Sequence, residues 1–406
     1  MDEIKRLISL ETKRQKETLM MIPSENYAYP EVRATVGSVL MHKYSEGYPH
    51  KRYYQGNKYI DEIEEIAIES AKKLFKTPHA NVQPYSGSPA NAAVYMALLD
   101  PGDIILGMSL NAGGHLTHGH PKITFSGKYF NSIQYGVDKN GYIDFSEVER
   151  LAKKHKPKLI IAGLTAYPRQ IDFEKFSEIS ESVGAYLMAD ISHISGLVVA
   201  GIHPDPSKFA HVITTTTHKI LRGPRGAIIM VTNKGLEKDL EMGKKIDRAV
   251  FPGLQGGPHD NTTAGIAIAL RFAQSENYKT YAKEVVNNAK MLSEELTKYG
   301  FDLVTNGTDN HLILIDLRRK NISGREFAER LEEAGVVVNY NAIPNDPNPP
   351  FNPSGIRLGT PALAARGMGE GEMKKIAKWI SEVSERKDRE KIAMEVKKLC
   401  EEFPID

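Results

Sequence analysis

The chain has 406 residues, and its 53 basic and 51 acidic side chains give a formal net charge of +2. Hydrophobic residues make up 41% of the chain, which is enough apolar surface for a core and excludes a mainly disordered protein. The near-neutral balance argues against a nucleic-acid-binding protein that depends on a basic surface. At about 150 residues per domain, the length allows two or three domains.

The cysteine content and the hydropathy pattern indicate the cellular compartment. Cys400 is the only cysteine, so no intramolecular disulfide can form, as is usual in a reducing cytoplasm. The charged, amphipathic N-terminus has no apolar stretch of the signal-peptide type, and no segment approaches the roughly 20 apolar residues of a membrane span. These features predict a soluble cytoplasmic protein with no membrane or nucleic-acid partner.

The first 80 residues combine helical patterns with a long irregular segment. About the first twenty residues have helical spacing, and Pro23 ends that region. Residues 27–57 are rich in Tyr, Gly and Pro with little periodicity, which favours an ordered loop that forms a contact surface. Residues 58–76 carry apolar side chains at helical spacing and predict an amphipathic helix.

From about residue 80 to residue 230, short apolar runs alternate with amphipathic segments such as 173–183. The runs that we interpret as strands lie near residues 103–107, 158–162, 185–189, 212–214 and 227–231. Apolar strands separated by helices predict an α/β fold with a mostly parallel sheet that helices cover on both faces.

The remaining chain predicts a second, smaller α/β domain. Residues 258–298 have a helical pattern, strands are expected near 311–316 and 336–338, and a last helical stretch begins at Glu370. We therefore expect an N-terminal helical arm over residues 1–25, a large domain over 26–277 and a small C-terminal domain over 278–406.

Polar residues follow several of the apolar runs. Asp190 and His193 follow one strand, the tetra-threonine run leads another into Lys219, and Thr165 follows a third. In parallel sheets ligands bind at the carboxyl ends of strands. A lysine amine and a carboxylate from another strand are the groups that pyridoxal phosphate requires, because the amine bonds its aldehyde and the acid keeps its pyridine nitrogen protonated.

A phosphate group needs backbone donors at the start of a helix, and residues 86–91 (Ser-Gly-Ser-Pro-Ala-Asn) have that form. Each feature alone has a simpler interpretation. A lysine is usually a solvated surface residue, Asp190 can be a helix cap, and Ser-Gly-Ser can be a plain turn. Their order along one predicted edge of the sheet favours the cofactor site.

A set of motifs extends over nearly the whole length of the chain. The motifs are Pro-Ser-Glu-Asn at 23–26, Lys-Tyr-Ser-Glu-Gly-Tyr-Pro at 43–49, Lys-Arg-Tyr-Tyr at 51–54, Asn-Val-Gln-Pro at 81–84, Ser-Gly-Ser at 86–88, Gly-Gly-His-Leu-Thr-His-Gly at 113–119, Asp-Ile-Ser-His at 190–193, Thr-Thr-Thr-Thr-His-Lys at 214–219, Gly-Pro-Arg-Gly at 223–226, Phe-Pro-Gly at 251–253, Gln-Gly-Gly-Pro at 255–258 and Ser-Gly-Ile-Arg-Leu-Gly-Thr-Pro at 354–361. In these motifs the chain resembles the serine hydroxymethyltransferases, which are fold-type-I pyridoxal-phosphate enzymes. Tetra-threonine-His-Lys together with the Tyr-rich segment is the most specific part of the resemblance.

The resemblance implies a role for each matching residue. Lys219 carries the internal aldimine with pyridoxal phosphate, Asp190 pairs with the pyridine nitrogen, His193 lies near the ring hydroxyl and His115 stacks on the ring. The other implied cofactor-binding residues are Tyr44, Ser86, Gly87, Ser88, Thr165, Thr216 and His218, with Gly256 and Gly257 supplied by the neighbouring subunit of a homodimer.

The same resemblance implies the substrate sites. Arg357 binds the substrate carboxylate, where a planar guanidinium can form a bidentate contact. Glu46 handles protons during the hydroxymethyl transfer, and the implied substrate-binding residues beside them are Ser24, Tyr53 and Tyr54. The implied folate-binding residues are Leu110, Gly114, His115, Leu116 and Asn341. The implied reaction converts serine and tetrahydrofolate to glycine and 5,10-methylenetetrahydrofolate.

The chain departs from the family pattern at a few positions. Tyr85 replaces a common His, Asn111-Ala112 replaces the usual pair, Ile220 replaces a usual Thr, and residues 259–263 (His-Asp-Asn-Thr-Thr) replace an apolar run. None of these changes removes an implied catalytic group. The last could alter the subunit interface or the pocket for the one-carbon carrier.

Other functions fit parts of the sequence. A folate-independent aldolase of 3-hydroxy amino acids would need the same cofactor residues, and a modified archaeal pterin could replace tetrahydrofolate. A non-catalytic interaction protein on the same fold is disfavoured by the full set of site residues. The spacing of His115, His118 and His120 could suggest a metal site, but no carboxylate or thiol nearby in the sequence completes it, so no metal is expected.

Overall fold

The structure is a computed structural model that describes residues 2–121 and 123–405, and within it the chain forms two compact units. The large unit comprises Ala28–Thr165 and Gln170–Lys279, and the small unit comprises Met1–Tyr27, Ala166–Arg169 and Thr280–Asp406. Each unit is described by itself.

A seven-stranded sheet forms the centre of the large unit, with the strand order β4-β10-β9-β8-β7-β5-β6. The five strands from β9 to β6 run parallel, whereas β10 and β4 are antiparallel to their neighbours. The strands are β4 (His79–Asn81), β5 (Ile104–Met108), β6 (Asn131–Tyr135), β7 (Leu159–Gly163), β8 (Tyr186–Asp190), β9 (Val212–Thr216) and β10 (Ala227–Val231).

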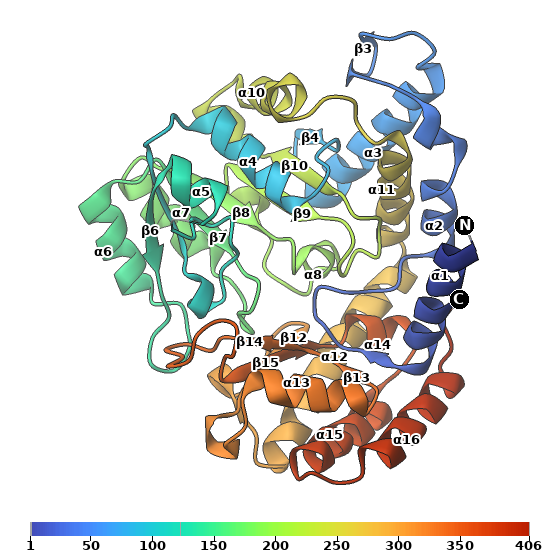
Figure 1. Cartoon of the computed structure of the whole chain (residues 1–406). Helices are drawn as coiled ribbons and strands as arrows, with labels where there is room; N and C mark the ends of the chain where they lie inside the picture. The colour runs from blue at the N-terminus through green and yellow to red at the C-terminus, as the bar shows by residue number, and fades with distance from the viewer. Residues whose placement is uncertain (1, 122, 406) are drawn as a thin grey trace. The chain divides into compact units, whose positions relative to one another are not determined.

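Both faces of this sheet are buried, which explains why its strands are continuous apolar runs. Successive residues such as Ile160 and Ile161 point to opposite faces, and both are fully buried. Figure 1 shows helices close to the strands, with α4 and α10 near β9 and β10 and α6 and α7 near β6 and β7. The helices of this unit are α2 (Pro30–Val36), α3 (Lys58–Phe75), α4 (Gly87–Leu98), α5 (Phe125–Tyr129), α6 (Phe145–His155), α7 (Phe173–Ser182), α8 (Ser195–Val199), α9 (Asn233–Lys238), α10 (Met242–Arg248) and α11 (Asp260–Ala273).

The small unit has a four-stranded antiparallel sheet with the order β11-β12-β15-β14, and a short parallel pair of β1 and β13. Leu19, Phe327 and Trp379 belong to its apolar core. Its strands are β1 (Leu19–Met20), β11 (Asp302–Leu303), β12 (Leu312–Asp316), β13 (Val336–Val337), β14 (Asn339–Asn341) and β15 (Gly355–Gly359). Its helices are α1 (Asp2–Glu17), α13 (Gly324–Glu333), α14 (Pro361–Ala365), α15 (Glu370–Ser384) and α16 (Arg389–Glu402), while α12 (Glu276–Lys298) begins in the large unit.

Arg366 fixes the end of the N-terminal helix α1 within the small unit. Its guanidinium donates hydrogen bonds to the backbone carbonyls of Lys16 and Thr18 near the end of α1, and to that of Cys400 near the end of α16. A cation is favourable at helix C-termini because their carbonyls lack partners within the helix. The helix itself buries none of its residues.

The predicted α/β fold with a mostly parallel sheet is confirmed, and each predicted strand and helix lies within a few residues of its expected place. The structure also contains strands that were not predicted, among them β6 and β15, and it changes the interpretation of two segments. The segment 27–57 is not all loop, because it contains α2 and a hairpin of β2 (Gly47–Tyr48) and β3 (Lys51–Arg52), and the pattern over 258–298 belongs to two helices, α11 and α12. In the described part of the chain, no helix is both long enough and apolar enough to span a membrane.

Candidate active site

A buried carboxylate lies at the carboxyl end of β8. Asp190 is 5% exposed. Its Oδ2 lies 3.0 Å from Nε2 of His118 and accepts a hydrogen bond from the side-chain amide of Asn91 at 2.9 Å. Its Oδ1 accepts a hydrogen bond from the backbone N–H of Ser192 at 3.1 Å. Burial alone would raise the pKa of Asp190, but these hydrogen bonds, that with His118 first, hold it well below its usual range. Asp190 is therefore ionised at neutral pH.

The partners of Asp190 are themselves held in place. The amide oxygen of Asn91 accepts from the hydroxyl of Thr214 on β9 at 2.8 Å, and its amide nitrogen also donates to Thr117 Oγ1 at 2.8 Å. The hydroxyl of Thr117 also lies 2.8 Å from Nδ1 of His115. The ring of His115 packs edge to face against that of His118, with the ring centroids 5.8 Å apart. One network therefore orients the carboxylate and the imidazole that is expected to stack on the cofactor.

Gly163, at the end of β7, leaves the space that this carboxylate occupies. A Cβ atom at position 163 would lie 2.9 Å from both Asp190 Cβ and His118 Cε1. We therefore expect Gly163→Ala to destabilise the large unit by about 1–3 kcal/mol, the usual cost of overpacking, and to weaken pyridoxal phosphate binding. Thermal unfolding and cofactor titration measure the two effects. Gly371→Ala is the control, because a Cβ there meets nothing within 4 Å, and equal behaviour of the two variants would contradict the prediction.

Lys219 follows β9, the strand next to β8. Its Nζ donates to Thr216 Oγ1 at 3.2 Å, and the backbone N–H of Thr216 donates to Ser192 Oγ at 3.1 Å. Since Ser192 also donates to Asp190, the lysine and the carboxylate belong to one hydrogen-bonded edge of the sheet. The prediction that both lie at carboxyl ends of parallel strands is confirmed.

The first turn of α4 faces the same edge. Ser86 is the N-cap residue of α4 but its side chain does not cap the helix, so the first backbone N–H groups have no side-chain partner there. A Cβ at Gly87 would lie 2.7 Å from Thr216 Cγ2, so only glycine allows this approach. His218 Nδ1 is buried without a hydrogen-bond partner among the described residues, and burial, then Lys219 and Arg225, lower the pKa of His218 to about 3. Neutral donors therefore surround a space suited to an anion.

Glu46 lies on a backbone segment that is fixed on both sides. Arg52 Nη1 donates to the carbonyls of Ser45 and Gly47 at 2.8 and 2.9 Å, and the N–H of Tyr53 donates to the carbonyl of Glu46 at 3.0 Å. The hydroxyl of Ser45 donates to Asp260 on α11. Three successive backbone carbonyls accept hydrogen bonds, which fixes the position of the Glu46 backbone.

Aromatic side chains expected to line the substrate pocket belong to the same segment as Glu46. The rings of Tyr44 and Tyr54 meet at 5.2 Å, whereas Tyr53 packs against Phe251 and is 73% exposed. A Cβ at Gly256 would lie 3.2 Å from Glu46 Oε1, and one at Gly257 would lie 3.1 Å from the Tyr44 ring. The structure therefore brings Tyr44, Glu46 and the two glycines together.

Four of the five residues that match the folate site lie in the loop after β5, and the fifth, Asn341, belongs to the small unit. Leu110 begins the short helix Leu110–Ala112, Leu116 is 44% exposed, and a Cβ at Gly114 would lie 2.1 Å from the carbonyl of Met108. The N–H of Thr165 donates to the carbonyl of Gly113 at 2.7 Å, which ties this loop to the end of β7. His193 is 3% exposed and follows β8, and Ser88 is in the first turn of α4.

Three predicted site residues belong to the small unit. Arg357 lies on β15, is 7% exposed, and its Nε donates to Asn339 Oδ1 at 3.2 Å. Burial lowers the pKa of Arg357 to about 10. Asn341 pairs with Gly355 at the end of β14, and Ser24 is half-buried after β1. A buried guanidinium is favoured by a carboxylate that can form two parallel hydrogen bonds with it.

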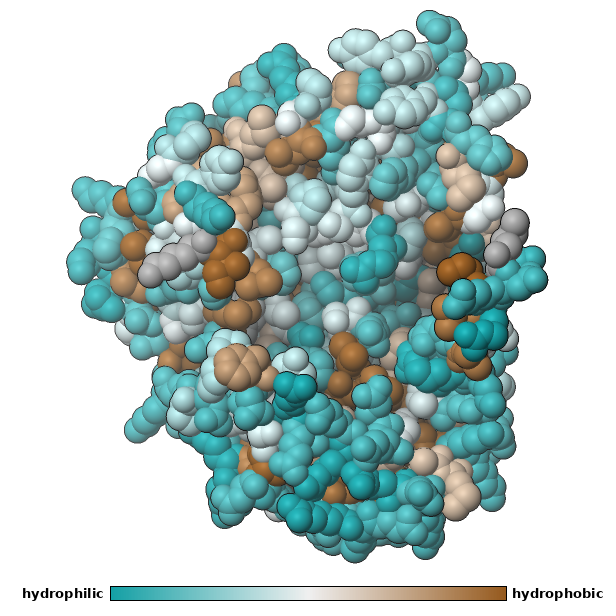
Figure 2. All heavy atoms as spheres, in the orientation of Figure 1, coloured by the Kyte–Doolittle hydropathy of each residue, from teal (hydrophilic) through white to brown (hydrophobic). Residues whose placement is uncertain are grey.

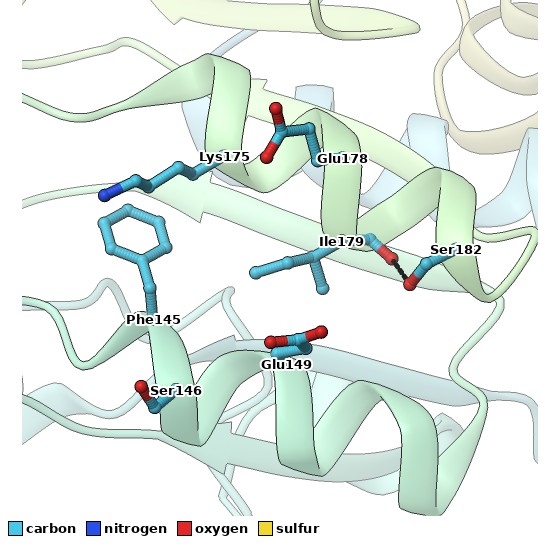
Figure 3. Close-up of a pocket in the computed structure, with 7 residues that line it drawn as sticks. All are labelled: Phe145, Ser146, Glu149, Lys175, Glu178, Ile179 and Ser182. Atoms are coloured by element: carbon cyan, nitrogen blue, oxygen red, sulfur yellow. Dashed lines mark hydrogen bonds between the residues drawn. The ribbon is translucent and has the colours of Figure 1, made fainter.

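A cavity of about 260 Å³ between α6 and α7 is not part of this site. Figure 3 shows Phe145, Ser146 and Glu149 on one helix facing Lys175, Glu178 and Ile179 on the other, with Ser182 Oγ donating to the carbonyl of Ile179. These side chains lie on outer helices, and the ammonium of Lys175 lies 5.2 Å from the centre of the Phe145 ring. The cavity contains no residue predicted from the sequence.

Sequence reasoning missed several residues around Asp190. In the sequence His118 is part of the 113–119 motif and of a His-x-x-His spacing but has no assigned role in the cofactor site, whereas in the structure it contacts Asp190. Asn91, Thr117 and Ser192 were not predicted as site residues either. The repeated histidines of residues 115–120 were the only signal for the position of His118, and nothing in the sequence paired it with Asp190.

The chain is similar in sequence to known proteins along its whole length. A family model described as serine hydroxymethyltransferase matches residues 1–380. A serine hydroxymethyltransferase of Acidothermus cellulolyticus is 54% identical over 409 residues, covering 98% of this chain and 94% of the relative. Proteins of the same description from Sorangium cellulosum (52% identical, 99% and 94% covered) and Dichelobacter nodosus (49% identical, 100% and 96% covered) are also similar to it.

Proposed function

The chain belongs to the serine hydroxymethyltransferase family, and from that premise we propose which of its residues bind the cofactor and the substrates and which move protons. The protein is a pyridoxal-phosphate-dependent transferase that interconverts serine and glycine, with tetrahydrofolate as the co-substrate. The observation that carries our assignment is the ionised, buried Asp190 at the end of β8, linked through Ser192 and Thr216 to Lys219.

The donors at this edge of the sheet fit pyridoxal phosphate. The uncapped first turn of α4 (Ser86, Gly87 and Ser88) and the unpartnered Nδ1 of His218 suit its phosphate, and we propose that Gly256 and Gly257 from the neighbouring subunit complete that site. Lys219 would hold the aldehyde carbon of the cofactor through its amine, and the residues that we propose around the ring are Tyr44, His115, Thr165, His193 and Thr216. When bound, the protonated pyridine ring withdraws electrons from the bond that breaks at the amino acid.

The residues of the chain supply binding and proton transfer. Asp190 holds a proton on the pyridine nitrogen, because its carboxylate stays ionised although it is buried. Arg357 binds the substrate carboxylate, with Ser24, Tyr53 and Tyr54 as the other proposed contacts. Glu46 transfers the proton of the serine hydroxyl, since its backbone is fixed at three carbonyls and it can hold one position. For tetrahydrofolate we propose Leu110, Gly114, His115, Leu116 and Asn341.

Hydride reduction tests the assignment of Lys219 directly. Protein incubated with pyridoxal phosphate and then reduced with borohydride is expected to carry the pyridoxyl group on Lys219, as peptide mass spectrometry would show. Addition of glycine is expected to shift the visible absorbance band, and serine cleavage is expected to depend on tetrahydrofolate. A label on another lysine would refute the assignment, and serine cleavage at the same rate without tetrahydrofolate would favour the aldolase alternative.

We also propose that the protein is a cytoplasmic homodimer whose subunits share their active sites. Support comes from apolar side chains that neither unit buries: Ile4, Leu7 and Ile8 on α1 are 47–62% exposed, and Figure 2 shows hydrophobic side chains exposed where Figure 1 labels α1. In the large unit, Met41 and Tyr53 are 58% and 73% exposed. Light scattering is expected to give twice the chain mass, and a monomer mass would contradict the proposal.

A further inference from the structure

Two residues at which the chain departs from the family pattern, Tyr85 and His259, contact each other. Their rings stack with centroids 4.1 Å apart and an interplanar angle of 6°. Tyr85 directly precedes Ser86 at the start of α4, and His259 directly precedes Asp260 at the start of α11. The contact therefore joins the phosphate end of the proposed site to the Gln-Gly-Gly-Pro segment of residues 255–258.

Polar contacts join the same two segments. The hydroxyl of Tyr85 donates to the carbonyl of Gly257 at 2.7 Å, and its backbone N–H donates to Gln255 Oε1 at 3.0 Å. The amide of Gln255 in turn donates to the carbonyl of Gln83 at 2.9 Å. Residues on both sides of Gly256 are thus fixed to the strand-to-helix connection that contains Tyr85.

The Gly256-Gly257 turn itself has donors available for a ligand. Neither of its backbone N–H groups has a hydrogen-bond partner within the described residues. Glu46 and the Tyr44 ring lie against the Cα atoms of the two glycines, so no side chain fits at either position without displacing them. With the Gly257 carbonyl bound by Tyr85, rotation of the neighbouring peptide groups is restricted.

Tyr85 remains a hydrogen-bond donor under the conditions in which the enzyme acts. Burial first, and then the nearby Tyr44 and Glu46, raise the pKa of Tyr85 above its ordinary value of 10. The phenol is therefore protonated at neutral and mildly alkaline pH, and its bond to the Gly257 carbonyl persists there.

We propose that Tyr85 and His259 are paired positioning residues that orient the N–H groups of Gly256 and Gly257 toward the phosphate of the cofactor bound in the neighbouring subunit of the proposed homodimer. This inference rests on the proposed function, which assigns that phosphate to the glycine pair. Donors fixed before the ligand arrives lose little conformational freedom when they bind it, so their orientation contributes to affinity. Neither side chain needs to touch the cofactor.

The test compares ligands with and without the phosphate. The dissociation constants of pyridoxal phosphate and of pyridoxal are measured by fluorescence titration of the full-length protein freed of cofactor. Tyr85→Phe removes the hydroxyl bond and keeps the ring, and we expect it to weaken pyridoxal phosphate binding about 3- to 10-fold, the range of one hydrogen bond. Pyridoxal binding is expected to stay unchanged, because pyridoxal has no phosphate.

Two further variants sharpen the test. His259→Leu removes the stacked ring, and a stacked aromatic pair contributes about 0.5–1.5 kcal/mol. We therefore expect the affinity for pyridoxal phosphate to fall about 2- to 13-fold, while the affinity for pyridoxal stays unchanged. The double variant is expected to lose less than the product of the two single losses, since both residues act on one segment. Tyr59→Phe is the matched control, because Tyr59 is a 68% exposed tyrosine of α3.

The outcomes separate this inference from the proposed function. If Tyr85→Phe and His259→Leu weaken both ligands equally, or neither, the positioning role is wrong. If the unaltered protein binds pyridoxal phosphate no more tightly than pyridoxal, or borohydride does not label Lys219, the proposed site itself is wrong. A loss confined to pyridoxal phosphate, absent in Tyr59→Phe, supports the inference.

Discussion

Replacement of Lys219 with alanine is expected to abolish the interconversion of serine and glycine while cofactor binding persists. The amine that holds the cofactor would be lost, and removal of the covalent group of an enzyme typically lowers turnover by about 10⁴-fold or more. The first turn of α4, His218 and Asp190 do not depend on that amine, so they would still bind pyridoxal phosphate non-covalently. Tetrahydrofolate-dependent serine cleavage measures the first effect and a cofactor titration measures the second.

Two further lysine variants show whether charge or chemistry explains the loss. Lys219→Arg keeps the positive charge, but a guanidinium is not a nucleophile near neutral pH, so it is expected to be as inactive as the alanine variant. Lys208→Ala removes an exposed lysine of the large unit and is expected to leave activity unchanged. Rapid multiple turnover by either Lys219 variant would refute the role of this residue.

The sequence was most informative where a general rule of α/β folds applies. Asp190 and Lys219 could be placed at one edge of the sheet because the carboxyl ends of parallel strands meet there. The orientation of β10 could not be predicted, because a buried five-residue apolar run has the same composition in a parallel and in an antiparallel strand.

Contacts between distant segments were beyond sequence reasoning. His118 lies 72 residues before Asp190, and only the path of the loop after β5 brings the imidazole to the carboxylate. Tyr85 and His259 could be recognised as departures from the family pattern, but their stacking depends on where α4 and α11 begin in space. Local periodicity contains no information about such pairs, whereas the family resemblance identified the residues without their partners.

The second large effect is expected at Arg52, which holds the Glu46 segment. Its guanidinium forms ion pairs with Asp61 at 2.8 Å and Glu64 at 2.6 Å, and the side chains of Arg52 and Glu64 are 4% and 2% exposed. Arg52→Gln would leave the carboxylates of Asp61 and Glu64 without the guanidinium that pairs with both. Removal of one partner of a buried ion pair typically costs about 3–5 kcal/mol. We therefore expect Arg52→Gln to lower the free energy of unfolding by that amount at neutral pH.

The pH dependence of that loss has a definite sign. Burial raises the pKa of Glu64, and the Arg52 guanidinium opposes the rise. Without Arg52 the pKa of Glu64 in the folded protein would therefore lie further above its unfolded value. A carboxyl group of this kind stabilises the folded state at low pH and loses that contribution as the pH rises. Urea unfolding at about pH 5 and about pH 8 is thus expected to show the larger loss at the higher pH.

Activity and a surface control complete the test of Arg52. The same substitution weakens the contacts to the carbonyls of Ser45 and Gly47, so kcat should fall further than the change in the unfolding midpoint explains, because Glu46 would no longer be fixed. Arg319→Gln breaks a pair with Asp302 in which the arginine side chain is 83% exposed, and such pairs contribute at most about 1 kcal/mol. If the two variants lost the same stability, or if the loss caused by Arg52→Gln relative to the unaltered protein were larger at the lower pH, Arg52 would not be the cation that holds this segment.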